Sequence, residues 1–178
     1  MSALERNLVQ YAAYHRDRRN IATHLVGVPT IVFSGLLALT TFAIPVGPLA
    51  VTGAAILSVA MVAWYLWLDR ALGVAMALAF FAMCAAASEI APRLGAGPTL
   101  ALAAALFTGG WALQFLGHKF EGMKPAFFDD VKQLLVGPLF VCAELAFLVG
   151  ARAELRSRIE QHVGPTLARR TPWPAALR

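Results

Sequence analysis

The sequence predicts an all-α protein, a multi-pass bundle of transmembrane helices. Of its 178 residues, 59% are hydrophobic and only 14% are charged, against about 25% charged residues in an ordinary soluble domain. Charged side chains are also absent from long continuous stretches, and a bilayer crossing needs about 20 apolar residues. We expect four clear spans, at about residues 21–42, 49–68, 71–88 and 99–117, followed by a broken or re-entrant apolar segment at 131–150.

The first 20 residues are expected to form an interfacial arm. Leu4, Leu8, Tyr11 and His15 recur at helical spacing, and four arginines supply charge, which is typical of a helix lying on a membrane surface. The arm lacks the short apolar core and small-residue cleavage site of a secretory signal. We therefore expect it to be retained.

The connections between the spans are marked by proline, glycine and aromatic residues. The first span contains His24 and Pro29, and because proline removes one backbone hydrogen bond, we expect a kink just after the histidine. Residues 44–48 are predicted to be a short turn. The second span ends in the aromatic run WYLWL before Asp69, a composition typical of the membrane interface. Residues 92–98 are predicted to form the next turn.

The last apolar segment decides on which side of the membrane the C-terminus lies. It is interrupted by Gly137 and Pro138, so we expect a break there, and irregular backbone at membrane depth indicates a protein-lined cavity. Lysine and arginine concentrate in the arm and in alternate loops, which by the positive-inside rule predicts a cytoplasmic N-terminus. A segment that turns back makes both termini cytoplasmic. Residues 1–163 then form a single membrane domain, and 164–178 are predicted to be a disordered tail.

The formal net charge of +5 does not indicate a nucleic-acid partner, because the basic residues flank apolar runs. Membrane topology explains their positions, and the expected partner is the lipid bilayer. The sequence contains no P-loop, GxSxG, HExxH or glycine-rich dinucleotide pattern, which excludes the nucleotide and serine-hydrolase chemistries that those motifs support.

The candidate site centres on the sequence WALQFLGHKFEG. His118 and Glu121 stand three residues apart, a spacing that puts both side chains on one face of a helix. With the predicted topology, His15 and His24 fall on the same cytoplasmic side. Imidazoles with a carboxylate suit non-haem Fe(II). The alternative is that His118 and Glu121 only form a hydrogen-bonded pair at a helix end.

His15 and His24 need a bend between them. They are nine residues apart, which on an unbroken helix puts them on opposite faces. We place the bend at Asn20, a poor helix former.

Three acidic residues have two kinds of predicted role. Glu144 lies in an apolar segment, where an acid is costly, so it is either a hydrogen-bond partner of a ligating histidine or a protonated acid bonded within the bundle. Asp129 and Asp130 are predicted to cap the helix that begins near Val131.

Two sequence blocks, YHRDRRNIATHLVGVPT and WALQFLGHKFEGMKPAFFDDVKQLLVGPLFVCAE, share a pattern with a known family. The pattern is a histidine, an asparagine and a second histidine before GxP, then a GHxxFE block, a PA pair, a helix with GP, and a glutamate. In this pattern the chain resembles the small multi-pass membrane family of 2-hydroxy fatty acid dioxygenases. The matching residues are His15, Asn20, His24, Gly27, Pro29, Gly117, His118, Phe120, Glu121, Pro125, Ala126, Pro138 and Glu144.

The resemblance implies an Fe(II)-dependent dioxygenase of fatty-acid α-oxidation. Such an oxidoreductase takes a 2-hydroxy fatty acid and dioxygen and shortens the acid by one carbon, here at the cytoplasmic membrane edge. The implied metal ligands are His15, His24 and His118, with Glu121 as a fourth ligand or an orienting base. Asn20 and Glu144 are implied to support the ligands by hydrogen bonding.

Further residues complete this hypothesis. Arg19 or Lys124 is expected to meet the substrate carboxylate, and His162 in the tail is an additional candidate ligand. The composition favours a bacterial inner membrane over the endoplasmic reticulum. The alternative from another class is a non-catalytic membrane transporter, or a metal- or lipid-binding helix bundle, in which polar groups line the whole depth of the membrane.

Overall fold

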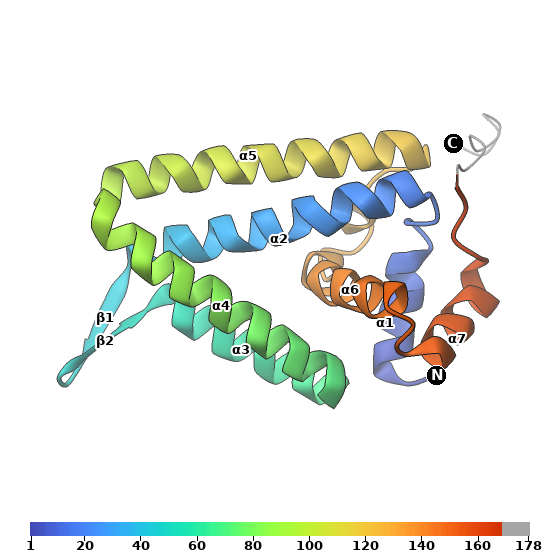
Figure 1. Cartoon of the computed structure of the whole chain (residues 1–178), viewed down its shortest axis with the longest axis horizontal. Helices are drawn as coiled ribbons and strands as arrows, with labels where there is room; N and C mark the ends of the chain where they lie inside the picture. Colours follow the sequence, from blue (N-terminus) through green and yellow to red (C-terminus); the bar gives the residue numbers. More distant parts are fainter. Residues whose placement is uncertain (169–178) are drawn as a thin grey trace. The chain divides into compact units, whose positions relative to one another are not determined.

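The computed structural model describes residues 1–168, which are mostly helical (Figure 1). These residues form seven α-helices, one 3₁₀ turn and one two-stranded hairpin. The helices are α1 (Ala3–Ala12), α2 (Arg18–Thr40), α3 (Gly53–Leu68), α4 (Arg70–Leu94), α5 (Ala96–Glu121), α6 (Gln133–Leu148) and α7 (Ala153–Val163). The strands are β1 (Ala43–Val46) and β2 (Leu49–Thr52), and the 3₁₀ turn is η1 (Ala126–Phe128). The prediction of a helical protein is confirmed.

Three helices in the described residues are long and apolar enough to cross a membrane, namely α2, α4 and α5. Helices α6 and α7, bent by 116°, pass the same test when they are taken as one span. Helix α3 has 16 residues and is about 24 Å long, which is less than the roughly 30 Å of a hydrocarbon core. The structure therefore indicates a membrane protein, but the count of four clear spans is not confirmed.

Residues 44–48 belong to a hairpin rather than to a simple turn. Ala43 pairs with Thr52, and Val46 pairs with Leu49, in antiparallel register. Gly47 has a φ of 59°, in the left-handed region that glycine adopts without strain. The Thr52 side chain then caps α3 by accepting a hydrogen bond from the Ala55 N–H. The hairpin takes residues that the prediction gave to the second span, and this is why α3 is short.

The chain divides into two compact units, Pro29–Gly110 and Met1–Val28 with Trp111–Arg178. In the first of these, α3 and α4 pack closely, because a Cβ on Gly73 would lie 2.6 Å from the Cα of Leu66. Leu37, Ala87 and Ala103 form a core cluster there. The histidines of the candidate site belong to the other unit.

In the histidine-containing unit, α1 packs on α6 and α7. A Cβ on Gly137 would lie 3.1 Å from the Tyr11 Oη, so glycine allows the tyrosine to approach α6. Helix α6 runs unbroken through Gly137 and Pro138, and the prediction of a break at these residues was wrong. Burial of their neighbours, including Val136, Leu139 and Phe140, offsets the one hydrogen bond that proline removes.

The break in the last segment lies at the end of α6 instead. Gly150 has a φ of 77°, its N–H donates to the Phe147 carbonyl, and the Ala151 N–H donates to the Ala146 carbonyl. This pair of bonds is a Schellman motif, which closes a helix and redirects the chain. The predicted bend is therefore present but starts about a dozen residues later in the chain.

The bend between the two N-terminal histidines lies at residues 13–17, between α1 and α2. Our placement of it at Asn20 was wrong, because Asn20 lies in the first turn of α2. The Asp17 carboxylate accepts a hydrogen bond from the Arg19 N–H at 2.8 Å, so Asp17 starts α2 in the manner of an N-cap. Helix α2 then continues without interruption through Pro29.

The predicted disordered tail begins within the described residues. The Leu167 N–H donates to the Arg16 carbonyl at 2.7 Å, and the Arg18 N–H donates to the Leu167 carbonyl at 2.9 Å. These bonds form a parallel bridge between Leu167 and Asp17. Residues 164–168 are thus attached to the loop before α2, and the remainder of the predicted tail, 169–178, lies outside the described residues.

Candidate metal centre

Three histidines from distant parts of the sequence meet at one point. His15 lies in the loop between α1 and α2, His24 lies on the second turn of α2, and His118 lies on the last turn of α5. All three are buried, and each offers one nitrogen within 4.8 Å of the other two. The rings cross steeply, at 76°, 70° and 82°. We call these residues the histidine triad.

Hydrogen bonds fix the protonation of two triad members. The His15 Nδ1 lies 2.7 Å from the Tyr11 carbonyl, and the His24 Nδ1 lies 2.9 Å from the Asn20 carbonyl. A carbonyl only accepts, so each Nδ1 carries the proton and donates it. Burial, with His24 and His118 nearby, holds the pKa of His15 well below its usual range, so its ring is neutral. Its Nε2 therefore carries a lone pair.

The triad nitrogens that remain lack protons or partners. The Nε2 atoms of His15 and His24 are 3.0 Å apart, and when both protons are on Nδ1, two lone pairs face each other and repel. The His118 Nδ1 is buried without a hydrogen-bond partner. A cation among these atoms would relieve the repulsion and give the third nitrogen a partner. The donor set thus fits a transition metal that prefers imidazole.

Aromatic side chains shield the triad. The Tyr11 ring stacks on His15 with centroids 4.1 Å apart and planes 5° from parallel. Phe140 lies 4.8 Å from the Tyr11 ring and 5.5 Å from the His15 ring. This apolar cover limits the access of water and fixes the orientation of His15, as the surroundings of a metal site commonly do.

Glu121 lies next to the loop that carries His15, and both of its oxygens accept hydrogen bonds. The Arg16 N–H donates to both oxygens at 3.0 Å, the Asp17 N–H donates to Oε2 at 2.9 Å, and the Asn20 side chain donates to Oε2 at 3.0 Å. Glu121 is 1% exposed. Among the described residues, the group of side chains close enough together to hold a metal ion consists of the three triad histidines and does not include Glu121. Its contacts are those of a residue that holds the loop in place.

Asn20 and Gly117 bring α2 and α5 together. The backbone carbonyl of Asn20 orients His24, and its side chain donates to Glu121 and to the Tyr14 carbonyl. A Cβ at Gly117 would overlap the Thr23 Oγ1 and the Asn20 Oδ1. Glycine at this position therefore permits the close approach that places His118 beside His24.

Two residues, Tyr11 and Gln114, were not predicted to belong to the site. Tyr11 was noted only for the helical pattern of the arm, and Gln114 was not noted at all. Both stand four residues before a triad histidine, on the same helical face or turn. For Gln114, the available signal was a polar residue in an apolar run at this spacing.

Glu144 lies in a different cluster from the triad. It lines a small pocket with Arg16, Arg156 and Glu160, and these three residues are its charged neighbours. The Arg16 side chain donates to the carbonyls of His15, Ala12 and Gly164. We predicted that Glu144 is a direct hydrogen-bond partner of a histidine. In the structure it instead lies beside Arg16, whose side chain bonds the loop that carries His15.

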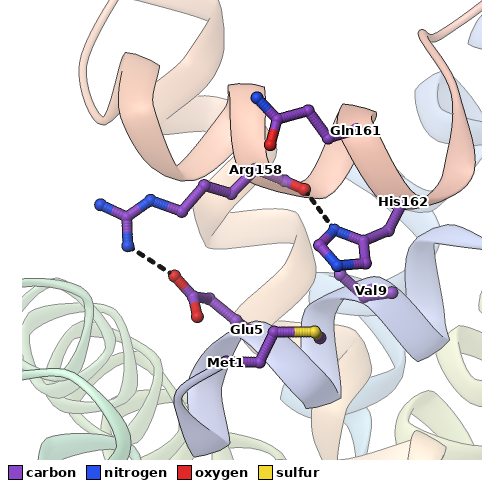
Figure 2. A pocket seen from close by; sticks show the side chains of 6 residues that line it. All are labelled: Met1, Glu5, Val9, Arg158, Gln161 and His162. Atoms are coloured by element: carbon purple, nitrogen blue, oxygen red, sulfur yellow. Dashed lines mark hydrogen bonds and ion pairs between the residues drawn. The ribbon is translucent and has the colours of Figure 1, made fainter.

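His162 is exposed on α7 and is not brought to the triad. Its Nδ1 donates to the Arg158 carbonyl at 2.7 Å. Figure 2 shows it among the side chains that line an open pocket between α1 and α7, beside the ion pair of Arg158 with Glu5. The volume of this pocket is about 280 Å³. The structure therefore does not support His162 as a ligand.

The two basic residues expected to meet the substrate carboxylate are both paired. Arg19 forms an ion pair with Asp17 at 2.7 Å and lies 4.7 Å from the centre of the Phe120 ring. Lys124 forms an ion pair with Asp129 at 2.6 Å. Asp129 is thus engaged away from the helix that we predicted it to cap.

Asp130 contributes to the start of α6. Its side chain accepts hydrogen bonds from the Lys132 N–H at 3.0 Å and the Gln133 side chain at 3.1 Å. The N-cap position of α6 is Lys132, which has no side-chain cap bond, so Asp130 bonds residues at the start of the helix without taking the predicted capping position.

Comparison with known proteins identifies the family. The family described as "2-hydroxy-palmitic acid dioxygenase Mpo1-like" matches residues 1–149. The chain belongs to this family. A member of the Mpo1-like family from Saccharomyces cerevisiae, named 2-hydroxy-palmitic acid dioxygenase MPO1, is 32% identical over 156 residues, which cover 84% of this chain and 83% of the yeast protein. No solved structure matches the chain.

The Mpo1-like assignment confirms the resemblance that the two sequence blocks carried. It also confirms that the chain is an enzyme of the oxidoreductase class. The matched residues include the whole histidine triad and Glu121, whereas α7 and the bridge at Leu167 lie beyond them.

Proposed function

We propose that this chain is an Fe(II)-dependent dioxygenase that shortens 2-hydroxy fatty acids by one carbon. The Mpo1-like family and its yeast member supply the substrate class and the type of reaction. The observation that supports a metal in the site is the 3.0 Å contact between the Nε2 atoms of His15 and His24, whose Nδ1 atoms both face carbonyls. Three buried imidazoles suit iron, and open positions on it would serve oxygen chemistry.

In this proposal His15, His24 and His118 hold the iron. When bound, Fe(II) supplies the activation of dioxygen and a Lewis-acid site for the 2-hydroxy carboxylate. The carbonyls of Tyr11 and Asn20 keep the ligating nitrogens free of protons. For Glu121 we favour the orienting role over that of a fourth ligand, because its oxygens accept hydrogen bonds from the His15 loop.

The overall reaction balances without a further reductant. Written as R–CH(OH)–COOH + O₂ → R–COOH + CO₂ + H₂O, it breaks the bond between C1 and C2, and the substrate supplies all the electrons that dioxygen accepts. The chain needs only to bind the acid, hold the metal and exclude bulk water. We therefore expect one dioxygen to be consumed for each shortened acid formed.

We place the reaction at the cytoplasmic edge of the membrane. The triad lies where α2 begins and α5 ends, and Arg16, Arg18, Arg19 and Lys119 surround these helix ends in sequence. Such a concentration of basic residues is typical of the cytoplasmic side, in a bacterial inner membrane by our expectation. The family match favours this enzyme over the transporter alternative.

The test measures metal and product in the same preparation. The protein is purified in detergent, loaded with Fe(II) without oxygen, and then given 2-hydroxyhexadecanoic acid and oxygen. We expect bound iron and pentadecanoic acid. The variants His15→Ala, His24→Ala and His118→Ala should lose both, because each removes a ligand.

The matched control is His162→Ala, which removes an exposed histidine outside the triad. It should keep iron and product. A wild-type protein that binds no metal, or triad variants that form as much product as the wild type, would contradict the proposal.

A further inference from the structure

The side chain of Gln114 is a buried polar group that the fold leaves without a partner. Gln114 is 5% exposed, and its Nε2 has no hydrogen-bond partner in the described structure. Buried amide groups are nearly always hydrogen-bonded, because burial removes their bonds to water. An unpaired donor at such a position calls for an acceptor that arrives from outside the chain.

Gln114 stands one helical turn from the triad. It precedes His118 by four residues on the continuous helix α5, so the two side chains share a face and their Cβ atoms are about 5–6 Å apart. Gly117, which lies against Asn20 and Thr23 of α2, is three residues from Gln114 and marks the same face. The unpaired amide therefore lies on the triad side of α5.

The positions of Gln114 and His118 along α5 indicate which part of a bound substrate would contact Gln114. His118 lies at the end of α5, and Gln114 lies one turn further into the apolar span. A fatty acid whose head is at the triad extends its acyl chain toward the apolar span. Its C2 atom, which carries the hydroxyl group, then lies deeper than its carboxylate.

Three basic side chains that could bind a substrate carboxylate already bond other groups. Arg19 and Lys124 form ion pairs with aspartates, and Arg16 donates to three carbonyls. Of the other buried unpaired side-chain atoms in the described residues, Asn20 Oδ1 and Gln133 Oε1 are acceptors, and His118 Nδ1 belongs to the triad. Gln114 Nε2 is thus the buried amide donor that remains for a substrate.

We propose that Gln114 is a specificity residue whose side-chain N–H donates a hydrogen bond to the 2-hydroxyl oxygen of the substrate. This inference rests on the proposed function. It assigns to Gln114 the discrimination between a 2-hydroxy acid and the plain acid of the same length. A site that pairs a buried polar group with a substrate hydroxyl disfavours the analogue that lacks it, because the group is then left unpaired.

The experiment measures binding rather than turnover. The Fe(II)-loaded protein is titrated without oxygen with 2-hydroxyhexadecanoate and with hexadecanoate, and bound iron is measured in the same samples. The main variant is Gln114→Met, which keeps the length of an unbranched side chain but removes the donor. Gln114→Leu is the second variant, so that the outcome does not depend on the folding of one protein.

We expect the wild type to prefer the 2-hydroxy acid. The affinity of the Gln114→Met variant for the 2-hydroxy acid should be about threefold to tenfold lower than that of the wild type, which corresponds to the free energy of one neutral hydrogen bond. Its affinity for hexadecanoate and its iron content should stay unchanged. The matched control is Gln133→Met, which removes another buried glutamine with an unpaired atom. It should keep the wild-type preference.

The outcomes separate this inference from the proposed function. A wild type that binds no iron or shows no preference overturns the proposed function. A wild type with the preference, together with Gln114 variants that retain it in full, overturns only the role of Gln114. An equal loss of affinity for both acids also overturns it, because the residue would then act on the carboxylate or on the structure in general.

Discussion

Replacing Glu121 with glutamine tests how the loop that carries His15 is held. The carboxylate accepts hydrogen bonds from the backbone of Arg16 and Asp17 and from the Asn20 side chain. Glu121→Gln keeps the size of the side chain, removes its charge and replaces one acceptor oxygen by an amide donor. The Arg16 N–H, now shared between both oxygens, would face an N–H group on one side.

The cost follows from the kinds of bonds that change. Hydrogen bonds to a charged group contribute about 1.5–3 kcal/mol, and neutral ones contribute about 0.5–1.5 kcal/mol. The bonds from Asp17 and Asn20 would each lose roughly 1 kcal/mol, and the bond from Arg16 would be weakened or lost. The folded state should therefore be destabilised by about 2–4 kcal/mol. Because His15 precedes Arg16, the metal affinity should fall about 10- to 100-fold, as for other residues that support ligands.

The assay is a titration with Co(II) in place of Fe(II), followed by absorption, together with thermal unfolding in detergent. Glu154→Gln is the matched control, since Glu154 is an exposed partner of Arg158. If Glu121 only orients the loop, saturating metal should restore the wild-type spectrum. A changed spectrum at saturation would instead indicate a lost ligand, and unchanged affinity and unfolding would refute both roles.

Three further predictions concern the packing and the metal. Gly117→Ala should lower stability by about 1–3 kcal/mol and weaken metal binding, because the new methyl group overlaps Asn20; unfolding and metal titration would show this, and a neutral effect would contradict it. Leu167→Pro removes the N–H that donates to the Arg16 carbonyl and should weaken metal binding, whereas the control Thr166→Pro leaves that bond in place and should not. Equal metal affinities of the two variants would contradict a role of Leu167 in holding the loop. Removing the metal with EDTA should lower the unfolding midpoint of the wild type, and a shift of the same size in His24→Ala would show that the metal binds elsewhere.

The histidine triad could be predicted because each step depended on regular features. Helical spacing placed His118 at the end of an apolar span, and charge patterning put it on the same side as His15 and His24. The sequence blocks then indicated the family, which the comparison confirmed. None of these steps needed the packing between helices.

The positions of the breaks could not be predicted from local propensity. Asn20 is a poor helix former, but its side chain and carbonyl bond to Glu121 and His24 inside α2, and these long-range contacts outweigh its intrinsic preference. Gly137 and Pro138 lie in a buried stretch of α6, where packing against Tyr11 maintains the helix. Gly150, with its positive φ, was the glycine that ended the segment.

The role of Glu121 also could not be predicted from the sequence, because a carboxylate near histidines is equally consistent with a metal ligand and with a residue that supports the ligands. The position of His15 favours the supporting role. Of the triad, His15 alone lies in a loop, whereas His24 and His118 are fixed by α2 and α5. A loop that must hold a ligand needs bracing that helices provide for themselves, and Glu121, the Arg16 side chain and the Leu167 bridge all contact it. Several polar groups around the site thus position one histidine, and the bridge at Leu167 does so from beyond residues 1–149, over which the chain matches the family.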